Sequence, residues 1–537
     1  MNAEGEEGVG EDRRGRRIGW LAHPLPWLLA QALVLWWRCA EAGLLVAERV
    51  PDSSGYLNLA NLSLDSKRWL EQVLGTTRTY GYPLFLKIAG WASPEHAAVP
   101  AAHLVCYIVA ILLSWHAFSR YSGRPWLAFW VVTPLFYAGV LSMAGRIQAD
   151  FLGAAAALAS LGLLLWLARR PESVALWSAL TASVALTYHV RPAYLFLLPL
   201  VPLLGVALRW LLPEERRLRW RWAVGLVLAM VLPFLAYSSL RWAVMGHFGL
   251  VSFGGYNLAG VVTPLLDEEL IAELPEEDQE LGRLVLEKRR EIGLETVSWD
   301  TPVEHWHGQY NRSVWSAAVP ASRQQVRQRW LGQEAAEAFE VRHRKRLKRK
   351  AALEGREPTA EERAQWREER RRRRAQRQIR RAQRAREVAA LNQGLNQLSR
   401  SILPLRPMLY GRWVVGGFFV GVAKAWSDPW VRWPAYGLLA TGLAVGGLGV
   451  AGRRRTRRRK SPPKELRPFF ARLRWTWRSA AMALVAVGYF AAGLGLVVLV
   501  EVPFDRYLIA LTLLLPGALL AALVEPWLGP AVRTRGV

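Results

Sequence analysis

The sequence predicts an all-α membrane protein, a polytopic bundle of about 11–12 transmembrane helices, from three observations. Long apolar blocks recur along the chain, and those at 151–168, 193–208, 223–240 and 480–500 approach or reach the length of about 20 residues that a helix needs to cross hydrocarbon. The blocks do not alternate as the strands of an outer-membrane barrel do, and only helices and closed barrels satisfy their own backbone in lipid. Several of the 27 tryptophans fall near the block ends, where an indole ring can be half hydrated.

The first apolar block, at 20–48, is predicted to be a retained signal anchor. It follows a basic tail, residues 1–19, with four arginines between Arg13 and Arg17, and it shows no small-residue cleavage site. This pattern places the N-terminus in the cytoplasm. Residues 49–96 then form an outer loop on the far side of the membrane.

The net charge of +27 is best explained by membrane topology. The surplus of arginine and lysine lies in short loops, such as 453–460, and in one insert, and no recognised nucleic-acid-binding module accompanies it. We therefore expect membrane lipids, and no nucleic acid, as partners. Cys39 and Cys106 both lie in apolar blocks, which argues against a structural disulfide.

Four regions are predicted from the segregation of polar and apolar residues. After the tail 1–19, residues 20–266 form a transmembrane module, 267–404 a charged, Arg-rich insert of long helices, and 405–537 a set of C-terminal transmembrane helices. Within the outer loop, the spacing of apolar residues between Tyr56 and Leu74 predicts short interfacial helices that roof a cavity. An ordinary surface loop is the alternative.

The membrane side of the last loop stays open at this stage. Further spans are expected near 407–426, 433–452, 475–500 and 506–527. Strict alternation then places the basic cluster 453–460 outside, whereas the positive-inside rule places it in the cytoplasm. The conflict disappears if 247–266 crosses the membrane or if another segment is re-entrant, and the sequence does not choose between these.

Three short motifs share the outer side in this topology. Asp52 follows the first span in PDSSGY, Asp150 opens a later span in GRIQADFLG, and Arg191 ends another in HVRP. Each also has a plain structural explanation. Acids favour helix N-termini, arginines reach toward the membrane interface, and a lone interfacial histidine such as His189 is more often a hydrogen-bonding group than a ligand.

The stretch from Pro51 to Trp91 resembles the first outer loop of GT-C superfamily glycosyltransferases of the protein O-mannosyltransferase and aminoarabinose-transferase type. The shared features are an acid directly after the first span, a following tyrosine, and an arginine before a Gly-Tyr-Pro-Leu-Phe stretch, which are here Asp52, Tyr56, Arg78 and 81–85. The resemblance implies an inverting enzyme that moves a sugar from a polyprenyl-phosphate donor to a lipid, glycan or protein acceptor. It also implies a multi-pass protein of the inner (plasma) membrane whose active site faces outside the cytoplasm.

The same resemblance implies roles for individual residues. Asp52 and Asp150 would be catalytic or metal-associated carboxylates, and the substrate-binding residues would be Tyr56, Arg78, Tyr82, His189 and Arg191. An inverting transfer needs a general base for the acceptor proton, and Asp52 is the candidate. Arg78 or Arg191 would stabilise the charge that develops on the leaving phosphate. A divalent cation, if one takes part, would be held by Asp52 and Asp150.

Two other groups of residues carry weaker signals. Four residues precede the last span, where donor contact and interface anchoring explain the Arg-Tyr pair equally well: Glu501, Asp505, Arg506 and Tyr507. His305 and His307 lack a third ligand at a sensible spacing, which favours an ordinary surface position over a metal site.

Two other functional classes remain. A transporter or flippase of a lipid-linked or anionic solute would use Asp52, Asp150 and Arg191 to line a path, although the two halves show no convincing pair of corresponding broken helices. A membrane scaffold organised by the basic insert is the other class. The chain has no Gly-Lys-Ser phosphate-binding loop and no dinucleotide fingerprint, which disfavours an ATP-driven pump.

Overall fold

The computed structural model describes residues 23–62, 69–76, 78–213, 220–326, 328, 387–440 and 476–528. In this part of the chain all regular secondary structure is helical, apart from one isolated β-bridge between Glu48 and Arg146. The predicted all-α class is confirmed. The basic tail 1–19, most of the Arg-rich middle of the insert and the cluster 453–460 lie outside the described residues.

Seven helical segments are long and apolar enough to cross a membrane. They are Val99–Ser122 (α6), Pro125–Met143 (α7, η2 and η3), Ala149–Arg169 (α8), Pro192–Leu211 (η4 and α10), Trp220–Met245 (α11), Trp477–Val500 (α21) and Asp505–Val524 (α22, η8 and α23). The apolar helix α9, Val174–Val190, is shorter than these segments. The first described helix, α2, covers residues Pro24–Glu41. This arrangement is that of a multi-pass membrane protein.

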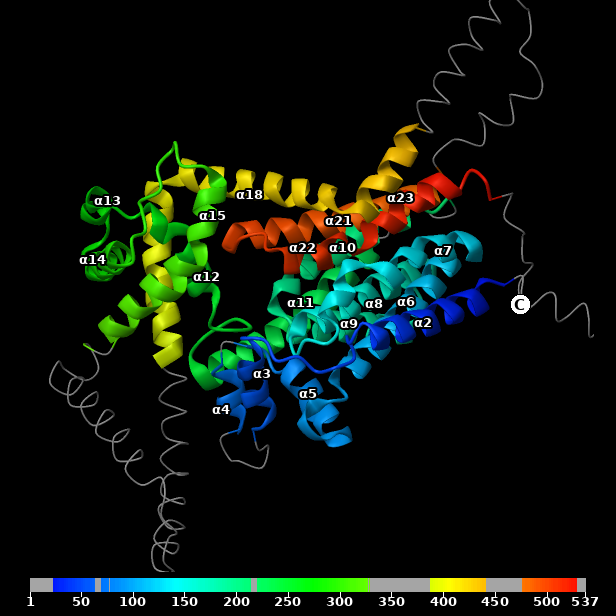
Figure 1. The fold of residues 1–537 in the computed structure, drawn as a ribbon, viewed down its shortest axis with the longest axis horizontal. Coiled ribbons are helices and arrows are strands. Elements are labelled where there is room, and N and C mark those ends of the chain that lie inside the picture. The colour runs from blue at the N-terminus through cyan, green and yellow to red at the C-terminus, as the bar shows by residue number, and fades with distance from the viewer. Residues whose placement is uncertain are drawn as a thin grey trace, which may run out of the picture.

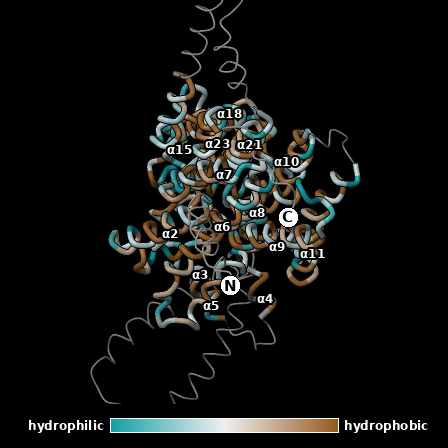
Figure 2. The backbone as a smooth tube through the Cα atoms, turned by 90° about the vertical axis from the view of Figure 1, so that its right-hand side faces the viewer, coloured by the Kyte–Doolittle hydropathy of each residue, from teal (hydrophilic) through white to brown (hydrophobic). Residues whose placement is uncertain are grey.

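Burial separates the central helices from the outer ones. Inside the protein, 83% of the apolar window of α8 is buried, whereas only 17% of that of α11 is. Helix α11 accordingly exposes Val224, Val227, Leu228 and Leu232. Figure 2 looks along the helices and shows hydrophobic segments of α11 at the edge of the bundle. In a chain with seven apolar spans, such a face is suited to contact with lipid.

Hydrogen bonds between segments that are distant in sequence define the two ends of the bundle. At one end, the Glu48 N–H donates to Gly145 O (2.8 Å) and Arg241 Nε donates to Leu74 O (2.8 Å). We call this the Asp52 end. At the other end, Arg478 Nε donates to Ser122 O (2.7 Å) and Arg209 Nη1 donates to Ala168 O (2.8 Å). We call it the Arg124 end, because Arg124 forms an ion pair there with Glu525.

Residues 407–440 make a single kinked passage between these ends. Helix α18, Pro407–Ser427, begins at the Asp52 end, where Trp413 Nε1 donates to Val498 O (2.8 Å). The helix breaks at Asp428, whose ψ of 119° is extended, and residues 429–440 are helical again. Trp430 stacks on Tyr137, and Gly437 lies against Leu523 toward the Arg124 end.

In the described residues, this passage is one crossing of the bundle where two separate spans, 407–426 and 433–452, were expected. The described part of the expected span 433–452 continues the passage of α18 and does not reverse it. The chain is next described at Thr476, at the Arg124 end, so both flanks of 441–475 lie at that end. The stretch 247–266 does not cross the bundle, because α12 (Gly254–Val262) packs into a separate core.

That separate core belongs to a subdomain formed by residues 254–326 and 387–405, at the left of Figure 1. Its elements are α12, η5 (Thr263–Leu265), α13 (Glu268–Glu273), α14 (Glu276–Glu291), α15 (Val303–Arg312), η6 (Ser313–Ala318), 387–402 and η7 (Leu403–Leu405). The subdomain docks on the Asp52 end, where the Tyr310 hydroxyl donates to Val500 O (3.4 Å).

The subdomain begins earlier than the predicted boundary at 267, because the GGYNLAG stretch is its first helix. The Gly255 N–H donates to Asn392 Oδ1 (2.8 Å), and a Cβ at Gly255 would lie 2.2 Å from Asn392 O. Glycine is therefore needed for this close approach. The contact between Gly255 and Asn392 joins the two halves of the subdomain, 254–326 and 387–405.

The outer loop folds into short helices at the Asp52 end. They are α3 (Ser53–Ala60), α4 (Trp69–Leu74), α5 (Gly81–Ala92) and η1 (Pro94–His96). Tyr56, Tyr82 and Leu86 form the small core between α3 and α5. Helices occur in the predicted stretch 56–74, and α5 adds a longer one (Figure 1).

Candidate functional site

Asp52 and Asp150 come to the same end of the bundle because two loops are tied together. The Glu48 N–H donates to Gly145 O (2.8 Å), and the Ile147 N–H donates to Glu48 O (2.9 Å). Next to this bridge, the buried Ser53 hydroxyl donates to Ile147 O (2.9 Å). A Cβ at Gly145 would lie 2.8 Å from Val46 O, so the bridge needs glycine there. The bridge fixes the starts of α3 and α8 side by side.

Asp52 is held between two arginines from distant parts of the chain. Its Oδ1 accepts from Arg78 Nη2 (2.8 Å), and its Oδ2 accepts from Arg506 Nη1 (3.2 Å). The carboxylate stays 39% exposed, so it is paired but not sealed off. Burial alone would raise the pKa of Asp52, but the positive charges of Arg78, Arg506 and Arg191 outweigh it and hold the pKa below its usual value.

The Arg78 side chain lies against α3, where it contacts Gly55 and Tyr56. Its guanidinium carbon is 4.2 Å from the centre of the Tyr56 ring, a cation–π contact. A Cβ at Gly55 would lie 2.8 Å from Arg78 Nε, so this glycine, three residues after Asp52, leaves room for the arginine side chain. Tyr82 stands behind Tyr56, with ring centres 4.9 Å apart, and its hydroxyl is 3.3 Å from His103 Nε2. Tyr82 is fully buried and therefore supports Tyr56 from behind.

Asp150 and Arg191 form a buried ion pair beside this group. Asp150 lies in the first turn of α8, and Arg191 caps the C-terminus of α9. The two side chains are 4% and 12% exposed. The Arg191 guanidinium also lies 4.9 Å from the centre of the Tyr507 ring. Because each charge is buried against the other, removing one would strand its partner.

Arg506 and Tyr507 complete the group from the start of α22. Besides Asp52, Arg506 contacts the Tyr507 hydroxyl through Nη2 (3.2 Å), and that hydroxyl donates to Glu501 Oε1 (2.8 Å). Burial raises the pKa of Glu501, although its contacts with Tyr507 and Arg506 oppose the shift. The sequence left donor contact and interface anchoring open here. The structure brings Arg506 to Asp52, and the signal was a charged Asp-Arg-Tyr run at the start of an apolar span.

The space between these side chains is small. A cavity of about 20 Å³ is lined by Asp150, Arg191, Tyr194, Arg506 and Tyr507, with apolar residues of α21 and α22. About 10–15 Å³ is needed to hold one water molecule, so this cavity has room for about one. The cluster is therefore in a closed arrangement, with its arginines paired to its own acids.

The histidines singled out in the sequence lie outside this group. The His189 ring packs on Tyr237 of α11, with ring centres 4.5 Å apart. His307 packs against Trp413 in the subdomain, with ring centres 4.5 Å apart, and His305 is exposed. Among the described residues, no three His, Cys, Asp or Glu side chains gather as metal ligands. A divalent cation bound to Asp52 would compete with Arg78 for the carboxylate, and one bound to Asp150 would compete with Arg191.

No protein-family model matches the sequence, and no curated protein or solved structure matches it. The function is therefore argued from the chemistry of the cluster.

Proposed function

We propose that this chain is a GT-C-like glycosyltransferase that moves a sugar from a polyprenyl-phosphate donor to an acceptor at the outer face of the plasma membrane. The observation that carries the proposal is the position of Asp52. Its carboxylate lies between Arg78 and Arg506 at one end of an apolar helical bundle, beside the Asp150–Arg191 pair. A general base and cationic groups for a phosphate thus stand within one cluster.

The three arginines suit a donor that gains charge as it reacts. A polyprenyl-phosphate sugar carries one negative charge on its phosphodiester, and the leaving polyprenyl phosphate carries a second. Guanidinium groups bind phosphate oxygens through paired N–H donors, more strongly than neutral groups do. In the structure, Arg78 and Arg506 each donate a hydrogen bond to the Asp52 carboxylate. A donor phosphate would replace that carboxylate as their partner.

This exchange would also prepare the base. When Arg78 and Arg506 turn to the phosphate, Asp52 loses contacts that hold its pKa low and becomes a better proton acceptor. The acceptor oxygen then attacks the anomeric carbon, and its proton passes to Asp52. The bond from that carbon to the phosphate oxygen breaks, and its electron pair leaves on the polyprenyl phosphate. Attack from the face opposite the leaving group inverts the anomeric centre.

The positive-inside rule supports the proposed side of the membrane. That rule counts basic residues in short loops and at the ends of spans. At the Arg124 end these are Arg120, Arg124, Arg169 and Arg170, against Arg49, Arg146 and Arg191 at the Asp52 end. We therefore assign the Arg124 end to the cytoplasm and the Asp52 end to the outside. The subdomain at the Asp52 end does not weigh against this, because segments longer than about 60 residues translocate largely regardless of charge. Outside the cytoplasm, a lipid-linked donor is the suitable sugar carrier.

The test compares envelope glycans, by mass spectrometry, from cells that lack the protein and are complemented with variants. The wild type and Asp300→Asn, an exposed acid of the subdomain, are expected to restore the missing glycan. Asp52→Asn is expected to lower its formation by about 10²–10⁴-fold, the usual contribution of a general base. Full restoration by Asp52→Asn would remove the assigned base.

The alternative, a transporter or flippase of a lipid-linked or anionic solute, makes a different prediction. The purified protein in proteoliposomes would then exchange labelled polyprenyl-phosphate sugar across the membrane without forming a covalent product. Exchange that survives Asp52→Asn, in the absence of any transfer by the wild type, would favour the transporter.

A further inference from the structure

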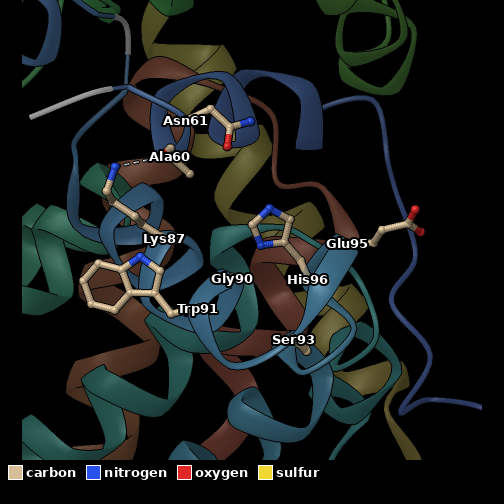
Figure 3. A pocket seen from close by; sticks show the side chains of 8 residues that line it. All are labelled: Ala60, Asn61, Lys87, Gly90, Trp91, Ser93, Glu95 and His96. Atoms are coloured by element: carbon tan, nitrogen blue, oxygen red, sulfur yellow. Dashed lines mark hydrogen bonds between the residues drawn. The ribbon is translucent and has the colours of Figure 1, made fainter.

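A second polar pocket lies in the outer loop, separate from the Asp52 cluster. Its volume is about 320 Å³, and its lining includes Asn61 at the end of α3, Lys87 and Trp91 of α5, and Ser93, Glu95 and His96 after it (Figure 3). Asp52 stands at the opposite end of α3 from this pocket, about 12 Å away along the helix axis at 1.5 Å per residue. None of the residues that line it contacts Asp52.

The backbone of the pocket is held in an uncommon conformation. Glu95 and His96 are consecutive non-glycine residues with positive φ, at 54° and 63°. Such residues are strained relative to the right-handed form, and strain of this kind concentrates at functional sites. Gly90 leaves room for the result, because a Cβ there would lie 3.0 Å from His96 Cε1.

The strained turn presents an imidazole with a nitrogen that lacks a partner. His96 Nδ1 is buried and has no hydrogen-bond partner among the described residues. Figure 3 shows the ring in the middle of the pocket and the Glu95 carboxylate turned away from it. Opposite the imidazole, Lys87 Nζ donates to Leu62 O (2.8 Å) and Ala60 O (3.4 Å). An ammonium group has three donors, so one of Lys87 remains for a ligand.

The face of α5 beside the pocket is apolar and exposed. Leu84, Ile88 and Trp91 follow the i, i+4, i+7 spacing of one helix face, and Trp91 is 77% exposed. Lys87 lies on the same face, three residues after Leu84. In a multi-pass membrane protein, an end-of-bundle helix with such a face lies at the membrane interface. The pocket then opens at the depth of the lipid headgroups.

We propose that this pocket binds the phosphate headgroup of a membrane phospholipid, with Lys87 and His96 as its donors and the α5 stripe against the acyl chains. The phosphate supplies the acceptor oxygens that the free ammonium proton and a protonated Nδ1 need. Lysine binds phosphate as a point charge, and Trp91 is suited to the headgroup level. The proposal stands on the pocket alone and does not depend on sugar transfer.

The test measures binding of a fluorescent short-chain phosphatidylglycerol to the full-length protein in neutral detergent, by anisotropy. Unlabelled dihexanoyl phosphatidylglycerol is expected to compete, whereas dihexanoyl glycerol, which lacks the phosphate, is expected to compete at least about tenfold less well. Inorganic phosphate is expected to compete equally poorly. Competition by inorganic phosphate as strong as by the lipid would overturn the assignment to a lipid.

Two variants connect the binding to the pocket. His96→Asn removes the imidazole but keeps a residue that adopts positive φ readily, and Lys87→Gln removes the charge. Each is expected to raise the Kd about tenfold, while Lys288→Gln, on the solvent face of α14, leaves it unchanged. Lys87 also holds two carbonyls, so His96→Asn keeps the test decisive if Lys87→Gln misfolds. An unchanged Kd in folded His96→Asn would overturn the proposal.

Discussion

Asp52 is at once the proposed base and half of two ion pairs, and these roles compete. A carboxylate between two guanidinium groups is a poor proton acceptor, because both contacts lower its pKa. The same contacts keep the arginines ordered where a phosphate would bind. The resting cluster therefore holds its own anion where the proposed donor phosphate would bind. The Asp52–Arg506 contact also links the outer loop to the last span.

Arg506 is expected to matter for transfer as much as the residues that the sequence singled out. Arg506→Met removes one of the two guanidinium partners proposed for the donor phosphate, and we expect a fall of about 10²–10³-fold in glycan formation. Arg506→Lys keeps the charge but loses the paired donors, so its loss should be smaller. Arg283→Met, an exposed site on α14, is the matched control. Wild-type glycan levels in Arg506→Met would show that Arg506 is only an interface anchor.

Glu501 gives the cluster a testable pH dependence. Its pKa is raised in the folded protein, so the ionised form is the less stable one there. Its contribution to stability is therefore greatest at low pH and is lost as the pH rises from the ordinary glutamate value of about 4.3 through the raised pKa. Glu501→Gln, which can still accept from Tyr507, should flatten this part of the curve of Tm against pH. An unaltered curve would contradict the assigned shift.

At the scale of elements, close helix contacts depend on glycines that composition does not distinguish. Gly517 of α23 faces α7, and a Cβ there would lie 2.2 Å from Val131 O. We expect Gly517→Ala to destabilise the protein by about 1–3 kcal/mol, because backbone cannot give way as a flexible side chain can. Gly411→Ala is the control, since nothing lies within 4 Å of its Cβ position. Tm measurements in detergent should separate the two variants.

Local sequence signals predicted the helices but not their neighbours. Apolar length predicted about 11–12 spans, and seven helical segments of the described residues are long and apolar enough to be spans. Such a signal is local, because the need to satisfy the backbone in lipid acts on each segment separately. Local sequence could not predict that Arg506 pairs with Asp52, since the two residues lie 454 residues apart along the chain. This pairing depends on how helices pack, as does the kink at Asp428 that joins α18 to 429–440. Likewise, His189 and Arg191 are neighbours in sequence, but only Arg191 turns toward the cluster.

At the scale of the whole molecule, the two ends of the bundle divide its chemistry. The Asp52 cluster, the phospholipid pocket proposed above and the subdomain (254–326 and 387–405) all lie at one end. Tyr310 of the subdomain and Trp413 and Tyr410 of α18 contact the Val498–Val500 turn of α21 there. The subdomain docks directly beside Glu501 and Tyr507, with Tyr310 against the Phe504 ring. In the proposed reaction, the subdomain and the outer loop would flank the path of an acceptor to Asp52.

This division predicts which positions a reagent outside the cell can reach. In a Cys39→Ala, Cys106→Ala background, Asp300→Cys in the subdomain should react with a membrane-impermeant maleimide in intact cells. Glu172→Cys, in the exposed turn between α8 and α9 at the Arg124 end, should react only after permeabilisation. Labelling of both positions from the same side would contradict the two-ended arrangement. The reverse pattern would place the Asp52 cluster in the cytoplasm, where the argument for a lipid-linked donor no longer applies.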